Sequence, residues 1–227
     1  MTSQDEPIPA PPALHELFEA AEQRWLDHWR RGPTRSTWRQ LPPQTGDHAP
    51  DVAVFDGHGQ SVRLSATWTD GPALLLFWRH WGCGCGTGRA DRLRDEFPAL
   101  REAGANVIVI GQGEPEHGDW YAERFGVPCP ILVDPTEAAY EAYGLVEMSP
   151  WLLLGEPKPE MSYFEDLIPA HRAKGRPVAD NPFLLPGEFV VNRAGVIVFA
   201  YRYGYCDNYP DTEALVDSIH EAVASRD

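Results

Sequence analysis

The sequence has little positive charge and few cysteines. Its 227 residues carry 19 Lys and Arg against 34 Asp and Glu, a formal net charge of −15, and the basic residues form no long run. Such a field repels phosphate backbones and anionic lipid, so neither nucleic acid nor a membrane surface is an expected partner. Four cysteines in a chain of this length are too few for a disulfide scaffold.

The sequence also has no obvious targeting or membrane segment. Its first residues, MTSQDEPIPAPPA, are acidic and proline-rich, without the basic and apolar regions of a secretory signal. The longest apolar run is far shorter than a membrane span. These features predict a soluble, cytoplasmic protein, in which cysteines are reduced by default. A close pair of cysteines is then expected to be catalytic or metal-binding rather than structural.

What the sequence does have is one unusual stretch, FWRHWGCGCG, at residues 77–86. Cys83 and Cys85 stand on either side of a single glycine, directly after an apolar run that predicts a buried strand. We expect this strand to deliver a thiol to the start of a helix. Helix N–H groups and a nearby guanidinium, from Arg79 or Arg89, favour the thiolate over the thiol. The pattern predicts a reactive cysteine.

Apolar periodicity predicts an α/β protein with an N-terminal helical extension. An amphipathic helix over 12–31, following a disordered tail, either docks on its own domain or forms a dimer contact. A first segment, 1–44, would precede one domain, 45–227, which carries an insertion at about 145–185. The remaining expected elements are a hairpin at 51–65, strands at 73–80, 104–113 and 130–135, helices at 87–101, 114–124, 136–144 and 161–174, a hairpin at 188–204 and a last helix from 211. Strands that alternate with helices imply a mixed sheet covered on both faces.

The stretch FWRHWGCGCGTGRADRL resembles the active-site segment of the peroxiredoxin-like branch of the alkyl hydroperoxide reductase/thiol-specific antioxidant family. The resemblance continues through GANVIVIG, PILVDP, AYEAYGL and PGEFVVNRAGVIVFAYRY. It implies a thioredoxin-like three-layer fold with a mixed central sheet. It also implies a thiol-dependent enzyme that reduces a peroxide without an organic or metal cofactor. Electrons would come from a thioredoxin- or glutathione-like donor.

In this resemblance Cys83 matches the nucleophile, and Arg79 and His80 match an Arg-His pair of which Arg79 would stabilise the anion. The sequence departs from the family at two points. The second cysteine of a Cys-x-x-Cys motif would fall at Gly86, whereas Cys85 lies one residue earlier. Position 80 also lacks the Thr or Ser hydroxyl of typical peroxiredoxins. The thiol chemistry is therefore better supported than peroxide specificity.

Three other thiols could resolve an oxidised Cys83 as a disulfide. Cys85 is always within reach, although such a small ring is strained and easily reduced. The strand before Cys206 should end at the catalytic edge of a thioredoxin-like sheet, which makes Cys206 a possible second resolving thiol. Cys129 precedes a parallel strand, so it should lie at the far edge and be structural.

The wall of the site on the substrate side is predicted to include Pro186, His80 and Trp81. Pro186 matches the cis-proline of thioredoxin-like proteins, which faces the catalytic cysteine. His80 would act as an acid/base or fill the site. Trp78 and Tyr205 are weaker candidates for the wall, and the insertion at 145–185 is a candidate lid.

Three alternatives remain open at this stage. The first is a dithiol–disulfide oxidoreductase without peroxidase activity. The second is a metal-binding thioredoxin-fold protein that uses His80, Cys83 and Cys85 for copper or zinc. The third is a module that has lost catalysis and binds a partner through the N-terminal helix or the insertion. The expected substrate is a small-molecule peroxide or disulfide, but the sequence does not identify which one. A homodimer is a further possibility.

Overall fold

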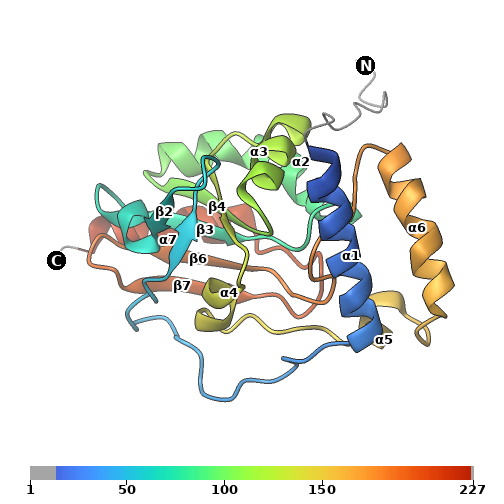
Figure 1. Ribbon diagram of the computed structural model, residues 1–227. Helices are drawn as coiled ribbons and strands as arrows, with labels where there is room; N and C mark the ends of the chain where they lie inside the picture. The colour runs from blue at the N-terminus through green and yellow to red at the C-terminus, as the bar shows by residue number, and fades with distance from the viewer. Residues whose placement is uncertain (1–13, 226–227) are drawn as a thin grey trace.

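The computed structural model describes residues 14–225, which form one seven-stranded mixed sheet with helices on both faces (Figure 1). The strand order is β2-β1-β5-β4-β3-β6-β7. The strands are β1 (Ala53–Phe55), β2 (Ser61–Arg63), β3 (Ala73–Phe77), β4 (Asn106–Gln112), β5 (Ile131–Asp134), β6 (Gly187–Val191) and β7 (Ile197–Arg202). The three inner strands β3, β4 and β5 are parallel, while β1 and β6 run antiparallel to their inner neighbours. The predicted mixed sheet is confirmed.

The central strand β3 shows why the fold has three layers. All five of its residues are buried, because alternate side chains enter two separate cores. Leu74 and Leu76 pack with helices α2 (Gly84–Glu102), α3 (Pro115–Phe125) and α7 (Thr212–Ala224). Leu75 and Phe77 pack on the other face against the short helix α4 (Ala138–Ala142) and the 3-10 turn Leu64–Trp68.

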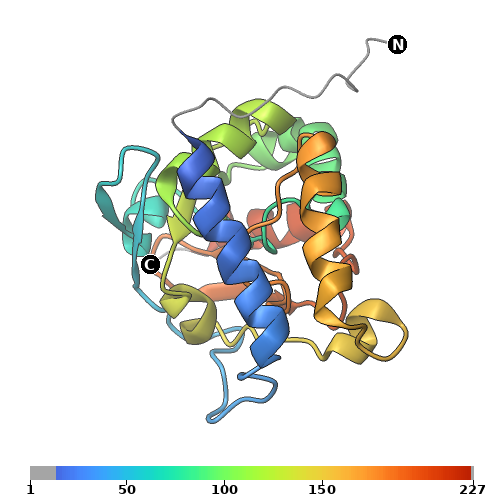
Figure 2. The same cartoon turned by 45° about the vertical axis from the view of Figure 1, so that its right-hand side comes forward.

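The N-terminal helix α1 (His15–Arg31) docks on its own chain. It lies beside α6 (Met161–Ala173) of the insertion (Figure 2), and the two share an aromatic cluster. Trp29 stacks on Phe164 with ring centroids 4.0 Å apart and meets Phe183 edge to face. Phe18 and Ala21, nearer the start of the helix, enter the core above α3. The alternative role of α1 as a dimer contact is therefore not needed to explain its apolar face.

Most of the element boundaries agree with the sequence predictions, with some differences. Helix α2 begins at Gly84 rather than at 87 and runs unbroken through Pro98, where a kink or restart was expected. The insertion holds a second short helix, α5 (Pro150–Leu154), besides α6. Residues 1–12, predicted to be disordered, lie outside the described residues. No helix within residues 14–225 is long and apolar enough to cross a membrane.

The segment 32–47 has no helix or strand, as predicted for a linker, but it is anchored to the domain. Glu147 accepts backbone N–H groups of Thr34 and Arg35, the latter at 2.9 Å. Trp38 donates its indole N–H to the Gly144 carbonyl at 2.8 Å. The division of the chain at residue 44 remains a prediction.

Candidate active site

Cys83 and Cys85 lie where the chain turns from the end of β3 into α2, and the structure joins them by a disulfide. Cys83 is the N-cap residue of α2, and its carbonyl accepts the N–H of Thr87 at 3.2 Å. Gly82 allows the turn because its φ is +83° and a Cβ there would lie 2.5 Å from the Pro177 carbonyl oxygen. Both cysteines are half-buried and Gly84 is exposed, so the disulfide is accessible from outside.

The Arg79 guanidinium holds both sulfur atoms. Its Nη1 lies 3.1 Å from Cys83 Sγ and 3.0 Å from Cys85 Sγ, and its Nη2 donates to the Pro182 carbonyl. The side chain is only 4% exposed. Burial lowers the pKa of Arg79, while the neighbouring Cys206 and Tyr205 raise it. Since a guanidinium keeps its proton in proteins, a fixed cation and the N-terminus of α2 both face this sulfur pair.

A small cavity of about 10 Å³ lies beside the disulfide. It has room for about one water molecule, so a substrate must reach the sulfur atoms from the exposed side. Its walls include Cys206 and Pro186, together with Arg79 and Cys85. The structure thereby places Cys206, beyond the end of β7, at the same edge of the sheet as Cys85.

Pro186 lines this cavity, but the prediction of a cis peptide bond is wrong. None of the peptide bonds in the described part of the chain is cis. A trans bond is the lower-energy form for X-Pro, and here it continues an extended chain into β6. Leu185 donates to the Val146 carbonyl at 2.9 Å, and Pro186 accepts from Tyr203 at 3.2 Å.

His80 and Trp81 are buried and are not among the residues that line the cavity. Burial, followed by the charge of Arg79, places the pKa of His80 well below its usual value, so its ring is neutral at pH 7. Its Nδ1 lies 2.8 Å from the Trp81 carbonyl, so this nitrogen carries the proton. Trp81 donates to the Gln112 carbonyl at 2.7 Å and stacks on Tyr121. In this structure both residues hold the loop, whereas Trp78 contributes to the cavity wall.

Arg89, the other guanidinium near the cysteines, is engaged elsewhere. It pairs with Glu188 of β6 and Glu96 of α2, each at 2.9 Å, and all three side chains are buried. The Tyr203 hydroxyl also donates to Glu188. This network fixes α2 against the sheet behind Cys85. Sequence reasoning missed it, although a glutamate within the buried strand GEFVV was a usable signal.

Cys129 lies at the opposite end of the sheet, before β5, and packs against the core. Burial raises the pKa of its thiol to about 12. The predicted structural role agrees with this environment. The metal-binding alternative gains no support from residues 14–225, which contain no group of three or more His, Cys, Asp or Glu that could share an ion.

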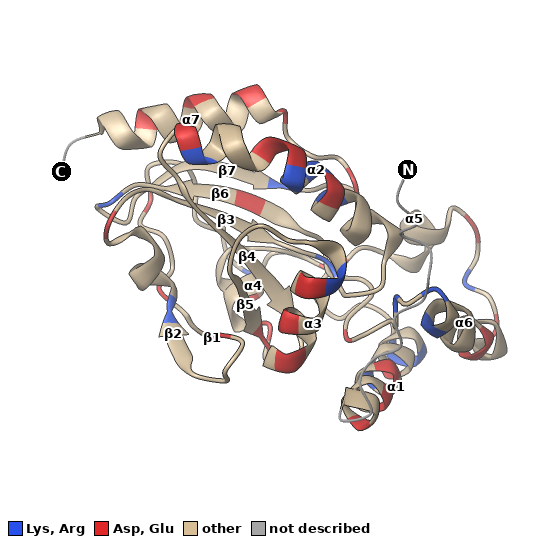
Figure 3. Cartoon of the chain, turned by 90° about the horizontal axis from the view of Figure 1, so that it is seen from above, with Lys and Arg blue, Asp and Glu red and all other residues tan. Residues whose placement is uncertain are grey.

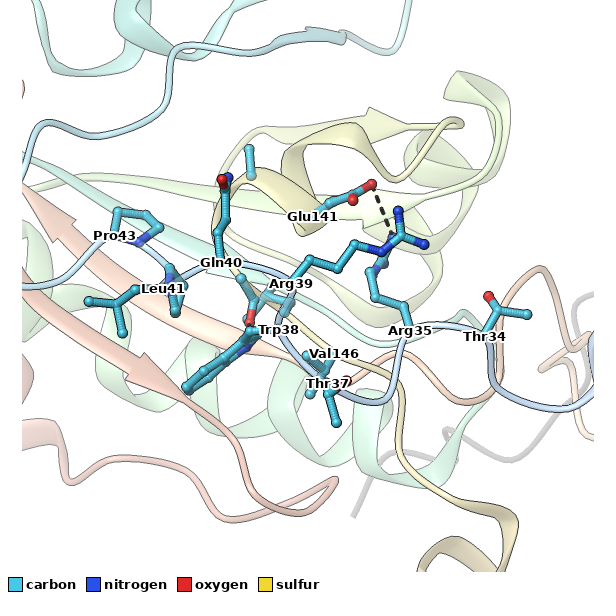
Figure 4. Close-up of a pocket in the computed structure, with 14 residues that line it drawn as sticks. Thr34, Arg35, Thr37, Trp38, Arg39, Gln40, Leu41, Pro43, Glu141 and Val146 are labelled. Atoms are coloured by element: carbon cyan, nitrogen blue, oxygen red, sulfur yellow. Dashed lines mark hydrogen bonds and ion pairs between the residues drawn. The ribbon is translucent and has the colours of Figure 1, made fainter.

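A separate hollow of about 460 Å³ lies between the segment 34–43 on one side and the end of α4 with the residues that follow it on the other (Figure 4). Arg35 and Glu141 form an ion pair of 3.7 Å at its edge. None of the candidate site residues lines this hollow. We assign it no part in the chemistry.

Comparison with known proteins agrees with this fold. Residues 92–204 match the profile of the AhpC/TSA antioxidant enzyme family. The chain carries an AhpC/TSA family domain. Among solved structures, that of the peroxidoxin BcpB from Mycobacterium tuberculosis superposes with a TM-score of 0.55 at 18% identity, covering 80% of this chain and 96% of that one. The thioredoxin-like fold is thus confirmed.

Relatives of this chain are named as thioredoxin-like proteins, as thiol-disulfide oxidoreductases and as peroxiredoxins. The chain is 28% identical over 128 residues to the chloroplastic thioredoxin-like protein AAED1 of Arabidopsis thaliana, covering 56% of this chain and 51% of that protein. It is 29% identical over 103 residues to the thiol-disulfide oxidoreductase ResA of Geobacillus thermodenitrificans, covering 44% of this chain and 57% of that protein. The chain thus spans about half the length of these relatives.

The profile match to the AhpC/TSA domain begins at residue 92, after the cysteine pair, and ends at 204, before Cys206. The match therefore establishes the family without assigning the reactive thiols. Their assignment rests on the geometry around Arg79.

Proposed function

We propose that this protein is a thiol-dependent oxidoreductase that reduces a peroxide through Cys83, with Cys85 as the first resolving thiol. One observation carries the proposal: the buried Arg79 guanidinium contacts both sulfur atoms at the N-terminus of α2. A cation and helix N–H groups at one sulfur pair stabilise the thiolate, which is the nucleophile in such chemistry.

The reaction proceeds in three balanced steps. The Cys83 thiolate attacks one oxygen of the peroxide O–O bond, which gives Cys83 sulfenic acid and expels an alkoxide or hydroxide, protonated from solvent to an alcohol or water. The Cys85 thiolate then attacks the sulfenic sulfur, which forms the Cys83–Cys85 disulfide and expels hydroxide, protonated to water. Two electrons from an external dithiol or two thiols restore the reduced pair. The disulfide of the present structure corresponds to the state after the second step.

Two further residues have proposed roles at this site. Cys206 borders the same cavity as Cys85 and Arg79, so it is a second resolving candidate when Cys85 is absent. Pro186 forms part of the same wall even with its trans bond. We retain His80 and Trp81 on the substrate side only as proposals, since both contribute to the loop scaffold.

The proposal is tested by trapping the sulfenic acid. The Cys85→Ser/Cys206→Ser variant is reduced, mixed with one equivalent of hydrogen peroxide and trapped with dimedone, and the adduct is located by peptide mass spectrometry. We expect one adduct, at Cys83, because neither resolving thiol remains. An adduct at Cys129 alone, or oxidation no faster than that of a free cysteine, would contradict the proposal. A matched Cys129→Ser variant should retain a rapidly oxidised Cys83.

A second candidate function is dithiol–disulfide exchange without peroxidase activity. It is favoured by the closed, half-exposed pair of neighbouring cysteines and by the name of the relative ResA. If the reduced pair is inert to peroxide but is oxidised by a small disulfide such as oxidised glutathione, this function replaces the first.

The cellular context remains a prediction. We propose a cytoplasmic protein acting on a small-molecule peroxide or disulfide with a thiol reductant. One relative is named as chloroplastic, so the compartment should be tested directly by fractionation. Size measurement in solution would test the possible homodimer.

A further inference from the structure

A groove of about 840 Å³ runs between α2, the end of α3 and the segment after α6. Its volume falls within the range of sites for small molecules. Its lining is mainly charged, with four cations and two carboxylates: Arg94, Arg124, Lys174, Arg176, Asp91 and Glu123. The chain as a whole is strongly acidic, and Figure 3 shows Asp and Glu on α1, α3, α6 and α7.

Three of the four cations in the groove have no carboxylate partner among residues 14–225, although the Arg124 guanidinium lies over the Phe125 ring at 5.5 Å. Arg94 is occupied, since it donates to Asp91 and to the Phe125 carbonyl. Arg124, Lys174 and Arg176 form no ion pair with any residue in the range 14–225. The Arg124 Nε is also buried without a hydrogen-bond partner among those residues. A buried donor left unpaired is costly unless a ligand or water satisfies it.

The groove has a positive local field despite the overall charge. His171, on the last turns of α6, is half-buried near these cations. Burial lowers its pKa first, and the charges of Arg176 and Lys174 lower it further. Cations that destabilise a nearby imidazolium would equally stabilise a nearby carboxylate.

Arg176 connects the groove to the disulfide. Its Nη1 lies 3.9 Å from the position that a Cβ would take on Gly84, the residue between the two cysteines. The backbone carbonyls of Arg176 and Pro177 also lie against Gly82, under 3.0 Å from the Cβ position there. None of the three residues Cys83–Gly84–Cys85 lines the groove, but an anion held by Arg176, at the groove's edge, would lie close to Gly84 between the two cysteines.

We propose that this groove recognises a small thiol that carries carboxylates, and that this thiol reduces the Cys83–Cys85 disulfide. The proposal rests on the proposed function, because it supplies the reductant of that cycle. We expect the ligand to carry a thiol, because a disulfide lies near Arg176 and a thiol can reduce it. We expect the ligand to carry carboxylates as well, because the groove residues without a carboxylate partner present two guanidiniums and one ammonium.

The reduction consists of two exchanges. A thiolate RS⁻ attacks one sulfur of the disulfide, forming a mixed disulfide and releasing the other cysteine as a thiolate. A second RS⁻ attacks the mixed disulfide, forming RSSR and releasing the remaining cysteine. The sum is two RSH plus the protein disulfide giving RSSR plus two protein thiols. Arg79 faces the sulfur that leaves in each exchange and stabilises its charge.

The test measures how fast three thiols reduce the oxidised protein, by acid quenching and mass spectrometry of the intact chain. The probes are glutathione, which carries two carboxylates and one ammonium, neutral 2-mercaptoethanol and cationic cysteamine, all compared per thiolate. Lys174→Glu/Arg176→Glu should slow the reaction with glutathione about tenfold through charge reversal. It should leave 2-mercaptoethanol unchanged and should accelerate cysteamine.

The control variant is Arg193→Glu, in the exposed turn after β6 at the opposite end of the sheet. It changes the net charge in the same direction and should leave all three rates unchanged. Added salt should slow glutathione with the wild-type protein, where it screens an attraction, and should speed it with the double variant, where it screens a repulsion. Arg124→Gln removes one groove cation without reversing its charge and should give a smaller loss with glutathione alone.

The proposal is overturned if the double variant slows all three thiols equally, or if its glutathione rate matches that of the wild type. A loss seen only with an acidic thioredoxin-like protein as reductant would also overturn it and would assign the groove to a protein partner. Because the assay starts from the disulfide, it does not require peroxide reduction. Failure of the peroxidase proposal would appear separately, as a Cys83 that peroxide does not oxidise.

Discussion

Cys83 and Cys129 are both half-buried cysteines of one domain, yet they lie at opposite ends of the sheet in opposite environments. Cys83 caps a helix and faces a guanidinium, whereas Cys129 precedes a strand and packs against apolar side chains. Burial raises the pKa of Cys129 to about 12. The comparison shows that topology, rather than exposure alone, separates a thiol suited to chemistry from one suited to packing.

The largest expected difference between the two regions is in peroxide-driven oxidation. Cys83→Ser should abolish it, because Cys83 is the proposed nucleophile and Cys85, which also contacts Arg79, is assigned only to resolve the oxidised Cys83. Cys129→Ser should leave the rate unchanged. The consumption of hydrogen peroxide by the reduced variants gives the measurement. If both variants lost the same amount of peroxide consumption, Cys83 and Cys129 would not differ in their role in the reaction.

Alkylation should separate the two regions by about a thousandfold. A pKa of about 12 leaves Cys129 with roughly one thousandth of the thiolate of an ordinary cysteine at pH 8. Native reduced protein is treated with iodoacetamide and labelling of each cysteine is followed over time by peptide mass spectrometry. Labelling of Cys129 at the rate of a free peptide cysteine would show that its burial does not control its reactivity.

Burial also changes the pKa of a histidine, His117, that lies beneath helix α1. His117 is fully buried against Phe18, and burial, followed by the charge of Arg24, lowers its pKa from 6.5 to about 4. The unfolded chain therefore binds a proton that the folded chain does not. His117 contributes stability that is full above pH 6.5 and is lost as the pH falls towards 4, by about 3 kcal/mol in all.

His117→Phe provides the matched comparison for this prediction. It keeps the stacked ring and removes the titration, so its free energy of unfolding should fall less between pH 7 and pH 4.5 than that of the wild type. Urea unfolding at several pH values measures both proteins. Parallel pH profiles for the two proteins would rule out a role for His117.

Arg79 gives the smallest of these effects. Arg79→Lys keeps a cation but loses the fork that reaches both sulfur atoms and the Pro182 carbonyl. The rate of Cys83 oxidation should fall about tenfold, while thermal unfolding of the oxidised variant shows whether the fold is intact. An unchanged rate in a folded variant would mean that the helix N-terminus alone activates Cys83.

Local pattern was sufficient to predict most of the fold. The run ALLLF, apolar at every position, is typical of a central strand, and the thioredoxin-like sheet implied by the family resemblance indicated which strand ends share an edge. This is why the placement of Cys129 at the far edge and Cys206 at the near edge could be predicted. The trans bond at Pro186 could not, because a family pattern carries no information about how the preceding loop reaches the strand in this chain.

The contributions of the insertion could not be read from the sequence either. Arg176 and Pro182 lie about a hundred positions from the cysteines along the chain, and nothing in their local pattern indicates that they reach Gly84 and Arg79. Arg89 was expected to favour the thiolate, and it does border the cavity beside Cys85, yet its charge is paired with Glu188 and Glu96. Partners brought together only by tertiary packing escape periodicity arguments.

The most direct test of the account is the intact mass and thiol count of the reduced protein before and after one equivalent of hydrogen peroxide at neutral pH. The account predicts a loss of two hydrogens within seconds, mapped to a disulfide between Cys83 and Cys85, with Cys129 untouched. Four intact thiols after exposure to both peroxide and a small disulfide would contradict it.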